Sequence, residues 1–239
     1  MSVKNSIPNA ITLMNLLCGV LGVIAALEGR FDLAFYLMLA GALFDFCDGL
    51  AARALKVESS IGRELDSISD IVTFGVLPAS MLYEMMRVST FSDRAVCFIP
   101  LVIALFSGLR LAKFNVDERQ HNSFLGLPTP ACAMICGSLC YFIAHDAHTF
   151  LAAWAAGFVF IPVLSVVLAA LLVCEIPMFS MKFGKDDGAI VRRKRIAFAI
   201  NIAIITAIVA SLGLNWSLAV LLAFIVYILM NLTFALLRI

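Results

Sequence analysis

The chain has 239 residues, of which 63% are apolar and only 14% are charged, and its formal net charge is +1. Soluble domains carry about 25% charged and 45–50% apolar residues, so the composition argues against a soluble enzyme and excludes a disordered chain or a nucleic-acid-binding module. Because the whole molecule has almost no net charge, only the placement of individual charges carries information about function.

Long apolar runs predict an all-α protein. A helix needs roughly 20 apolar residues to cross a hydrocarbon core of about 30 Å. On that basis we expect a polytopic integral membrane helix bundle with about eight transmembrane helices, forming a single membrane domain over residues 1–239. In chain order the expected spans are Ile7–Leu27, Phe31–Ala54, Leu65–Met86, Ala95–Phe114, Leu127–Ala144, Phe150–Glu175, Ile196–Leu214 and Trp216–Leu237.

The basic residues predict how these spans are oriented, because Lys and Arg concentrate in short cytoplasmic loops. If the N-terminus is inside, only Arg30, Arg87 and Arg94 of the 17 basic residues fall in outside segments. Both termini are therefore expected in the cytoplasm. The run Arg192–Arg195, expected in a loop, is read as a topology signal, with attraction to anionic headgroups as the alternative.

Four aspartates lie inside the predicted spans, where a carboxylate costs at least ~2.5 kcal/mol and is a functional candidate by default. Asp45 and Asp48 share one face of the second span. Asp66 and Asp70 share one face in the first turns of the third span. Both pairs reach about 10–12 Å from the basic residues at the cytoplasmic ends, so two antiparallel neighbours would bring the four acids together.

Three interpretations of these acids stay open on the residues alone. A divalent cation would relieve their mutual repulsion, and oxygen ligands favour Mg²⁺, Mn²⁺ or Ca²⁺ over zinc. Two-metal carboxylate sites support displacement at phosphorus. The alternatives are an ion pathway in a carrier and structural pairing with Arg53 or Arg63. The small residues Gly49 and Ala52 leave space beside the acids, which favours a ligand site.

The acids belong to a longer pattern. It reads Asp45-x2-Asp48-Gly49-x2-Ala52-Arg53-x8-Gly62-x3-Asp66-x3-Asp70. This pattern resembles the signature of the CDP-alcohol phosphatidyltransferase family at every fixed position. The resemblance implies transfer of a phosphatidyl or similar group from a CDP-linked donor to an alcohol, with release of CMP.

The resemblance also implies a cofactor and roles for the acids. It places Asp45, Asp48, Asp66 and Asp70 on divalent metal ions. The expected ions are Mg²⁺ or Mn²⁺, two per active site, and Ca²⁺ is also able to occupy it. Asp70 is in addition the expected general base, which suits an alcohol acceptor because a hydroxyl group is a poor nucleophile at neutral pH.

Outside the signature the chain is similar to the phosphatidylserine synthase branch of this family, in the stretches Ile7–Asn15, Leu109–Val116, Phe124–Pro130 and Ile176–Lys182. That similarity implies CDP-diacylglycerol as donor and L-serine as acceptor, with phosphatidylserine and CMP as products. A sibling transferase with a glycerol 3-phosphate or inositol acceptor is the first alternative, and a divalent-cation carrier the second. The catalytic helices are expected over about residues 7–175, whereas the C-terminal helix pair, about 196–237, resembles nothing specific.

Two sets of substrate-binding residues follow as predictions. Contact with CDP-diacylglycerol is expected from Asn9, Thr12, Asn15, Gly49, Ala52, Arg53 and Gly62. The alternatives are close helix packing, interhelical hydrogen bonds, a membrane anchor at Arg53 and a chain bend at Gly62. Serine is expected at Arg110, Asn115 and Thr129. Arg110 is the first choice because a guanidinium recognises a carboxylate with two parallel hydrogen bonds.

The same reasoning predicts where the protein works. We expect an integral protein of the bacterial cytoplasmic membrane with its active site at the cytoplasmic face. The lipid donor would enter laterally from the bilayer, and serine would arrive from the cytoplasm. The family resemblance further implies a homodimer, and no nucleic acid is expected as a partner.

Overall fold

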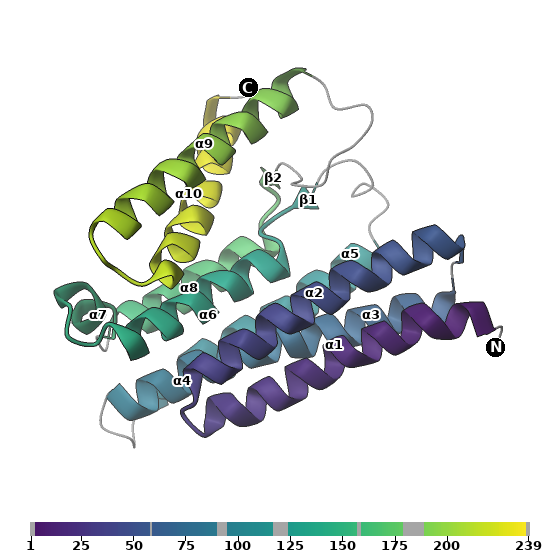
Figure 1. Cartoon of the computed structure of the whole chain (residues 1–239), viewed down its shortest axis with the longest axis horizontal. Helices are drawn as coiled ribbons and strands as arrows, with labels where there is room; N and C mark the ends of the chain where they lie inside the picture. The colour runs from purple at the N-terminus through teal and green to yellow at the C-terminus, as the bar shows by residue number, and fades with distance from the viewer. Residues whose placement is uncertain are drawn as a thin grey trace.

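The computed structural model describes residues 3–57, 59–89, 95–116, 124–156, 159–178 and 189–237, and almost all of them are helical (Figure 1). The strands of this described part are β1 (Phe124–Leu125) and β2 (Pro177–Met178), which pair antiparallel. An all-α bundle is therefore confirmed, with a minimal strand pair as its one addition among these residues.

The first two helices form a long antiparallel hairpin. They are α1 (Val3–Leu27) and α2 (Phe31–Leu55), which lie side by side in Figure 1. Gly29 has φ of 73° in the turn between them, a conformation that glycine adopts without strain. At its other end α2 stops at Lys56, whose left-handed backbone bonds back to the last turn of the helix.

A continuous helical segment follows, composed of α3 (Ser60–Ile71), the π-helical turn η1 (Val72–Val76) and α4 (Leu77–Ser89). The predicted third span began at Leu65, but the helix begins at Ser60. The reason is a cap, because the Ser59 side chain accepts the Gly62 N–H at 2.9 Å. The expectation that Gly62 bends the chain between helices is wrong, since Gly62 lies in the first turn of α3.

The middle of the chain supplies four helices. A 3₁₀ segment η2 (Ala95–Leu101) leads into α5 (Val102–Val116), and α6 (Thr129–His145) follows β1. The prediction of one helix over Phe150–Glu175 is wrong, because α7 (Phe150–Ala155) and α8 (Phe160–Val173) are separate. Pro162 explains where α8 starts, since a proline has no N–H to donate and is accommodated in a first helical turn.

Helix α6 occupies the centre of the bundle. It is buried along nearly its whole length and packs against α2, α4 and α10. Gly137 permits the close approach to α2, because a Cβ there would lie 2.7 Å from the Phe35 ring. Helix α6 therefore anchors α2, which itself packs against α1.

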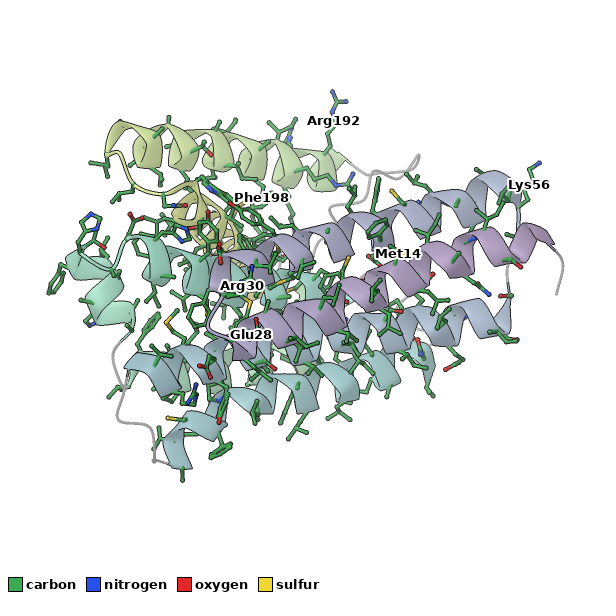
Figure 2. The ribbon with its side chains drawn as sticks, turned by 60° about the horizontal axis from the view of Figure 1, so that its bottom comes forward. Met14, Glu28, Arg30, Lys56, Arg192 and Phe198 are labelled. Atoms are coloured by element: carbon green, nitrogen blue, oxygen red, sulfur yellow. The ribbon has the colours of Figure 1, made fainter. Side chains whose placement is uncertain are left out.

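The last two helices, α9 (Ala189–Ser211) and α10 (Trp216–Leu237), form a hairpin outside the α1–α5 group (Figure 1). Helix α10 packs against both α6 and α9. The basic run Arg192–Arg195 was expected in a loop but lies within α9, where the Lys194 ammonium sits 4.3 Å above the ring of Phe234. The side chain of Arg192 points away from the rest of the protein (Figure 2).

Several helices have the length and composition of membrane spans. Six helical stretches qualify within the described residues, namely Ser6–Leu27, Phe31–Leu55, Ser60–Val88, Ala95–Val116, Arg192–Ser211 and Trp216–Leu237. Helices α6 and α8 are apolar but shorter. The protein is thus a polytopic integral membrane helix bundle, while the count of eight crossings and the cytoplasmic termini stay predictions.

Cysteine substitutions at the two ends of α2 test the predicted orientation of the helices in the membrane. Figure 2 shows Lys56 at one end of the α1–α2 hairpin and Glu28 and Arg30 at the other. In a cysteine-free background, Lys56→Cys should react with a membrane-impermeant maleimide only after cells are permeabilised, because the loop charges place Lys56 in the cytoplasm. Arg30→Cys, the matched control, should react on intact cells. The reverse labelling pattern would contradict the orientation.

Candidate active site

Helices α2 and α3 bring three aspartates into one cluster. Three carboxylate oxygens lie within 4.8 Å of one another, one each from Asp45, Asp48 and Asp66. Oxygens bound to one cation are separated by at most twice the metal–oxygen distance, about 4–5 Å for Mg²⁺ to Ca²⁺. Oxygen atoms are also the ligands that these hard cations prefer. The cluster is therefore compatible with a divalent cation.

Asp70 stands one turn beyond Asp66 on the same face of α3. It interacts electrostatically with the other three aspartates, and its Oδ1 is 3.5 Å from the Asn15 Nδ2. The four predicted acids thus lie in one group, in which Asp70 is outside the cluster of three. Their assignment as metal ligands, and that of Asp70 as base, stay predictions.

Helix α1 supplies hydrogen-bond donors to this group. Thr12 is buried and donates through Oγ1 to Asp48 Oδ2 at 2.6 Å, while Asn15 faces Asp70. These contacts are the interhelical hydrogen bonds that sequence reasoning left as the alternative to nucleotide contact. They hold the acids in place, which leaves a ligand role for Thr12 and Asn15 as a prediction.

Two further residues join α1 to the helix of Asp66 and Asp70. Thr73 Oγ1 donates to the Asn15 carbonyl at 3.1 Å, and Ser69 Oγ lies 3.2 Å from the Thr12 carbonyl. Ser69 also lies 2.9 Å from the Leu65 carbonyl in its own helix, so its one proton serves both acceptors. Sequence reasoning missed this pair, although buried hydroxyls four residues apart in an apolar span were a signal for it.

The two predicted glycine contacts differ in what the protein packs against them. A Cβ at Gly62 would lie 3.0 Å from Asn9 Oδ1 and 2.9 Å from Ser59 Oγ, so helix packing alone accounts for glycine there. At Gly49 a Cβ would meet only the Arg53 guanidinium, at 3.8 and 3.9 Å, among the described residues. Packing therefore gives no reason for glycine at Gly49. The half-buried Ala52 and the exposed Arg53 complete this stretch of α2.

Arg110 of α5 is the one cation of the predicted serine site and is only 7% exposed. Its Nη1 donates weakly to Thr129 Oγ1 at 3.4 Å, and its Nε has no hydrogen-bond partner among the described residues. The guanidinium also interacts electrostatically with Asp70. A buried donor without a partner is costly, so this arginine is suited to an anionic ligand.

The third predicted serine residue lies apart from that pair. Asn115 is at the exposed end of α5 and donates to Ser67 Oγ of α3 at 2.9 Å. Thr129, in contrast, is buried at the first position of α6, beside Arg110. The structure therefore groups Arg110 with Thr129 and places Asn115 in a separate bond between α5 and α3.

The fold and the acid cluster define the class: a polytopic integral membrane protein whose carboxylate site is compatible with a divalent cation. The sequence model of one family, CDP-alcohol phosphatidyltransferase, matches residues 5–169. The chain belongs to the CDP-alcohol phosphatidyltransferase family. The matched segment contains α1 to α7 and most of α8, and it ends before α9 and α10.

Three curated relatives that share one enzyme name are similar to part of this chain. The chain is 37% identical over 130 residues to the CDP-diacylglycerol–serine O-phosphatidyltransferase of Bacillus subtilis, covering 54% of this chain and 72% of the relative. It is 33% identical over 138 residues to the enzyme of that name from Methanocaldococcus jannaschii, covering 58% and 62%. The Mycobacterium leprae enzyme of that name is 33% identical over 184 residues, covering 73% and 58%. The chain thus spans about three fifths of the length of the last two relatives.

Removing one acid tests the cation site. Asp45→Asn and Asp66→Asn should each weaken Mn²⁺ binding to the purified protein by more than the roughly 10- to 100-fold that losing a hydrogen-bond partner of a metal ligand costs. The physical reason is loss of one oxygen from a three-residue cluster. Titration calorimetry measures it. Asp32→Asn, an exposed acid at the far end of the same helix, is the control and should bind as the wild type does. Unchanged binding in both cluster variants would refute the site.

Proposed function

We propose that this protein transfers the phosphatidyl group from CDP-diacylglycerol to L-serine, giving phosphatidylserine and CMP. The observation that carries the proposal is the assembly of all four signature aspartates in one group beside a buried arginine. The names of the relatives support serine as the acceptor. In the reaction the serine oxygen forms a bond to the phosphatidyl phosphorus, and the phosphorus–oxygen bond to CMP breaks.

The donor binds at the acid cluster in this proposal. Asp45, Asp48, Asp66 and Asp70 would hold divalent cations, Mg²⁺ or Mn²⁺ and two per site, with Ca²⁺ also able to bind. Such cations neutralise a diphosphate and stabilise a departing nucleotide phosphate. The Arg53 guanidinium extends back along α2 to Gly49 and supplies a further positive charge for the phosphates. Gly49 and Ala52 would leave room for the nucleotide against α2. Gly62 in the first turn of α3, and Asn9 of α1 beside it, would contribute further contacts.

Asp70 would act on the acceptor as its general base. Serine's hydroxyl needs a base within hydrogen-bond reach of its proton. Asp70 lies outside the cluster of three, held by Asn15 and in electrostatic contact with Arg110. A serine whose carboxylate pairs with Arg110 would present its hydroxyl toward Asp70, which takes the proton as the oxygen attacks phosphorus. Two oppositely charged protein groups thus orient one zwitterionic substrate.

The surroundings of Arg110 favour a carboxylate over a phosphate. The described groups that interact electrostatically with its guanidinium are Asp70, Cys132 and Tyr227, and none of these is a second cation. The positive end of α6, which begins at Thr129, also faces this region. A singly charged carboxylate matches this modest positive potential, whereas the doubly charged phosphate of glycerol 3-phosphate calls for more basic residues.

The cellular setting is part of the proposal. The loop charges support an active site at the cytoplasmic face of a bacterial cytoplasmic membrane. The donor lipid would then enter from the bilayer and serine from the cytoplasm. A homodimer is proposed from the family resemblance alone. Asn115, at the exposed end of α5, and its half-buried partner Ser67, in the middle of α3, would lie on the cytoplasmic side in this orientation.

A substitution at Gly49 tests whether this part of α2 binds the nucleotide or only packs against other residues. Gly49→Ala should not lower the melting temperature, because the new methyl group meets no described neighbour closer than 3.8 Å and alanine is a better helix former than glycine. If the nucleotide lies against this helix, the same methyl group should raise the KM for CDP-diacylglycerol about tenfold, a cost of roughly 1–3 kcal/mol for overpacking. Gly19→Ala is the contrasting control, because its Cβ would lie 2.4 Å from Thr73 Oγ1 and should lower stability. An unchanged donor KM would show that Gly49 does not contact the nucleotide.

A panel of acceptors tests the proposed function, with CMP release from CDP-diacylglycerol measured for serine, glycerol 3-phosphate and inositol. Serine should be the preferred acceptor. Arg110→Ala should raise the serine KM roughly 10- to 150-fold, equivalent to about 1.5–3 kcal/mol, and leave the donor KM nearly unchanged. Arg110→Lys should rescue only in part, because an ammonium lacks the bidentate fork.

The panel also separates the alternatives. Preference for another acceptor would identify a sibling transferase. Absence of metal-dependent CMP release with every acceptor would favour a divalent-cation carrier. If Arg110→Ala lost donor affinity and kept its serine KM, the arginine would belong to the phosphate site instead.

A further inference from the structure

We propose that Thr73 positions Asp70, the general base of the proposed reaction, by fixing Asn15 of α1 against it. Thr73 is a positioning residue rather than a catalytic one, because its hydrogen bond goes to Asn15 and it acts on Asp70 through that residue. This inference rests on the proposed function, since it adds a role to the base of that reaction.

Thr73 lies where three helical segments meet. It is fully buried in η1, three residues after Asp70, and its Oγ1 donates to the Asn15 carbonyl of α1 at 3.1 Å. Two glycines enclose the rest of the side chain. A Cβ at Gly19 of α1 would collide with Oγ1, and a Cβ at Gly41 of α2 would lie 2.6 Å from Cγ2. Thr73 is therefore fixed in position by both α1 and α2.

Asn15 is held on two sides in consequence. It is fully buried, its carbonyl accepts from Thr73, and a Cβ at Gly41 would lie 2.9 Å from its Oδ1. That Oδ1 has no hydrogen-bond partner within the described part of the chain, whereas the Nδ2 faces Asp70 Oδ1 at 3.5 Å. The flipped amide would turn its oxygen toward the carboxylate, which accepts but does not donate when ionised. Asn15 thus presents an N–H to Asp70.

The length of that last contact explains why positioning matters. A separation of 3.5 Å is longer than an ordinary N–H···O bond. Hydrogen bonds at catalytic sites are often long before the substrate binds and tighten only in the complex. A small shift of Asn15 would therefore decide whether the bond forms. The hydrogen bond from Thr73 ties the backbone of Asn15 to η1 and limits that shift.

Thr73 also lies within a local irregularity of its helix. In η1 the Leu77 N–H bonds to the Val72 carbonyl, five residues back rather than four. Such π-helical turns recur at functional sites. This one packs against α1, α2, α5 and α6, so it lies at the junction of the helices that carry the acids and Arg110. The irregularity coincides with the contact between Thr73 and Asn15.

Thr73→Val is the direct test, because valine keeps the shape of the side chain and removes the hydroxyl. With Mn²⁺ and both substrates saturating, kcat should fall about 3- to 10-fold, the range for one hydrogen bond. The KM values for serine and CDP-diacylglycerol should stay within about twofold, because the lost interaction acts when the base takes the proton. Ser80→Ala, the matched control, removes a buried hydroxyl that bonds to the Val76 carbonyl of the same helical segment, and it should leave kcat unchanged.

Thr73→Ser separates positioning from a general structural effect. Serine keeps the hydroxyl and loses the methyl group that lies against Gly41. Its kcat should stay within about twofold of the wild-type value, while its melting temperature falls because a small cavity remains. Activity should thus follow the hydroxyl, and stability should follow the methyl group. If kcat instead fell with the melting temperature across both variants, Thr73 would be structural and the inference wrong.

A comparison with Asn15→Leu tests the route through Asn15. Leucine has nearly the shape of asparagine but offers no N–H to Asp70. If Thr73 acts through Asn15, adding Thr73→Val to Asn15→Leu should lower kcat by less than about twofold further. Effects that multiply in full would show that Thr73 acts by another route. Recovery of the wild-type kcat by Thr73→Val on addition of more Mn²⁺ would assign Thr73 to cation binding and would also overturn the inference.

A variant on α2 protects the test against misfolding of a single protein. The new Cβ in Gly41→Ala would displace the Asn15 amide, so kcat should fall in the folded protein while both KM values hold. A normal kcat in folded Thr73→Val would refute the inference, and loss of folded protein in both variants would leave Thr73 with a structural role only. Failure of the proposed function would look different, because the wild-type protein would then release no CMP in response to serine.

Discussion

Repulsion among four aspartates inside membrane-spanning helices is the constraint on which the rest of the site depends. Asp45, Asp48 and Asp66 place oxygens within 4.8 Å of one another, and carboxylates within membrane-spanning helices are costly. Helix α1 relieves part of this cost by packing against both α2 and α3 and donating from Thr12 and Asn15. Bound cations would relieve the remaining repulsion. Repulsion among the aspartates therefore links the packing of α1 against α2 and α3 to the proposed metal chemistry of the site.

The sequence predicted the parts of this arrangement that follow from periodicity. Residues three or four apart share a helix face, which was sufficient to pair Asp45 with Asp48 and Asp66 with Asp70. Hydropathy could not locate the start of α3, because its polar first turn is set by the Ser59 cap rather than by apolar residues. It also missed the separation of α7 from α8, since that stretch is uniformly apolar and only Pro162 marks the start of the second helix.

The spacing of residues along one helix could not predict contacts between segments far apart in the sequence. Gly49 and Gly62 are both fixed positions of one signature, yet only Gly62 is packed against another helix, by Asn9. Arg110 and Asn115 were both predicted to bind serine, but Arg110 is buried beside Thr129 of α6, whereas Asn115 is exposed and bonded to Ser67.

These contacts indicate a division of labour between the two halves of the active site. The acids and the donor-facing glycine stand on α2 and α3, inside the segment that the family shares, and they would act on a CDP group common to every substrate pair. The acceptor side stands on α5 and α6. A carboxylate paired directly with Arg110 would stabilise the arginine but neutralise it, whereas its hydrogen-bond partner Thr129 is uncharged. Holding a buried cation with neutral groups leaves its charge for the acceptor, and the acceptor that satisfies it best is one that carries a carboxylate.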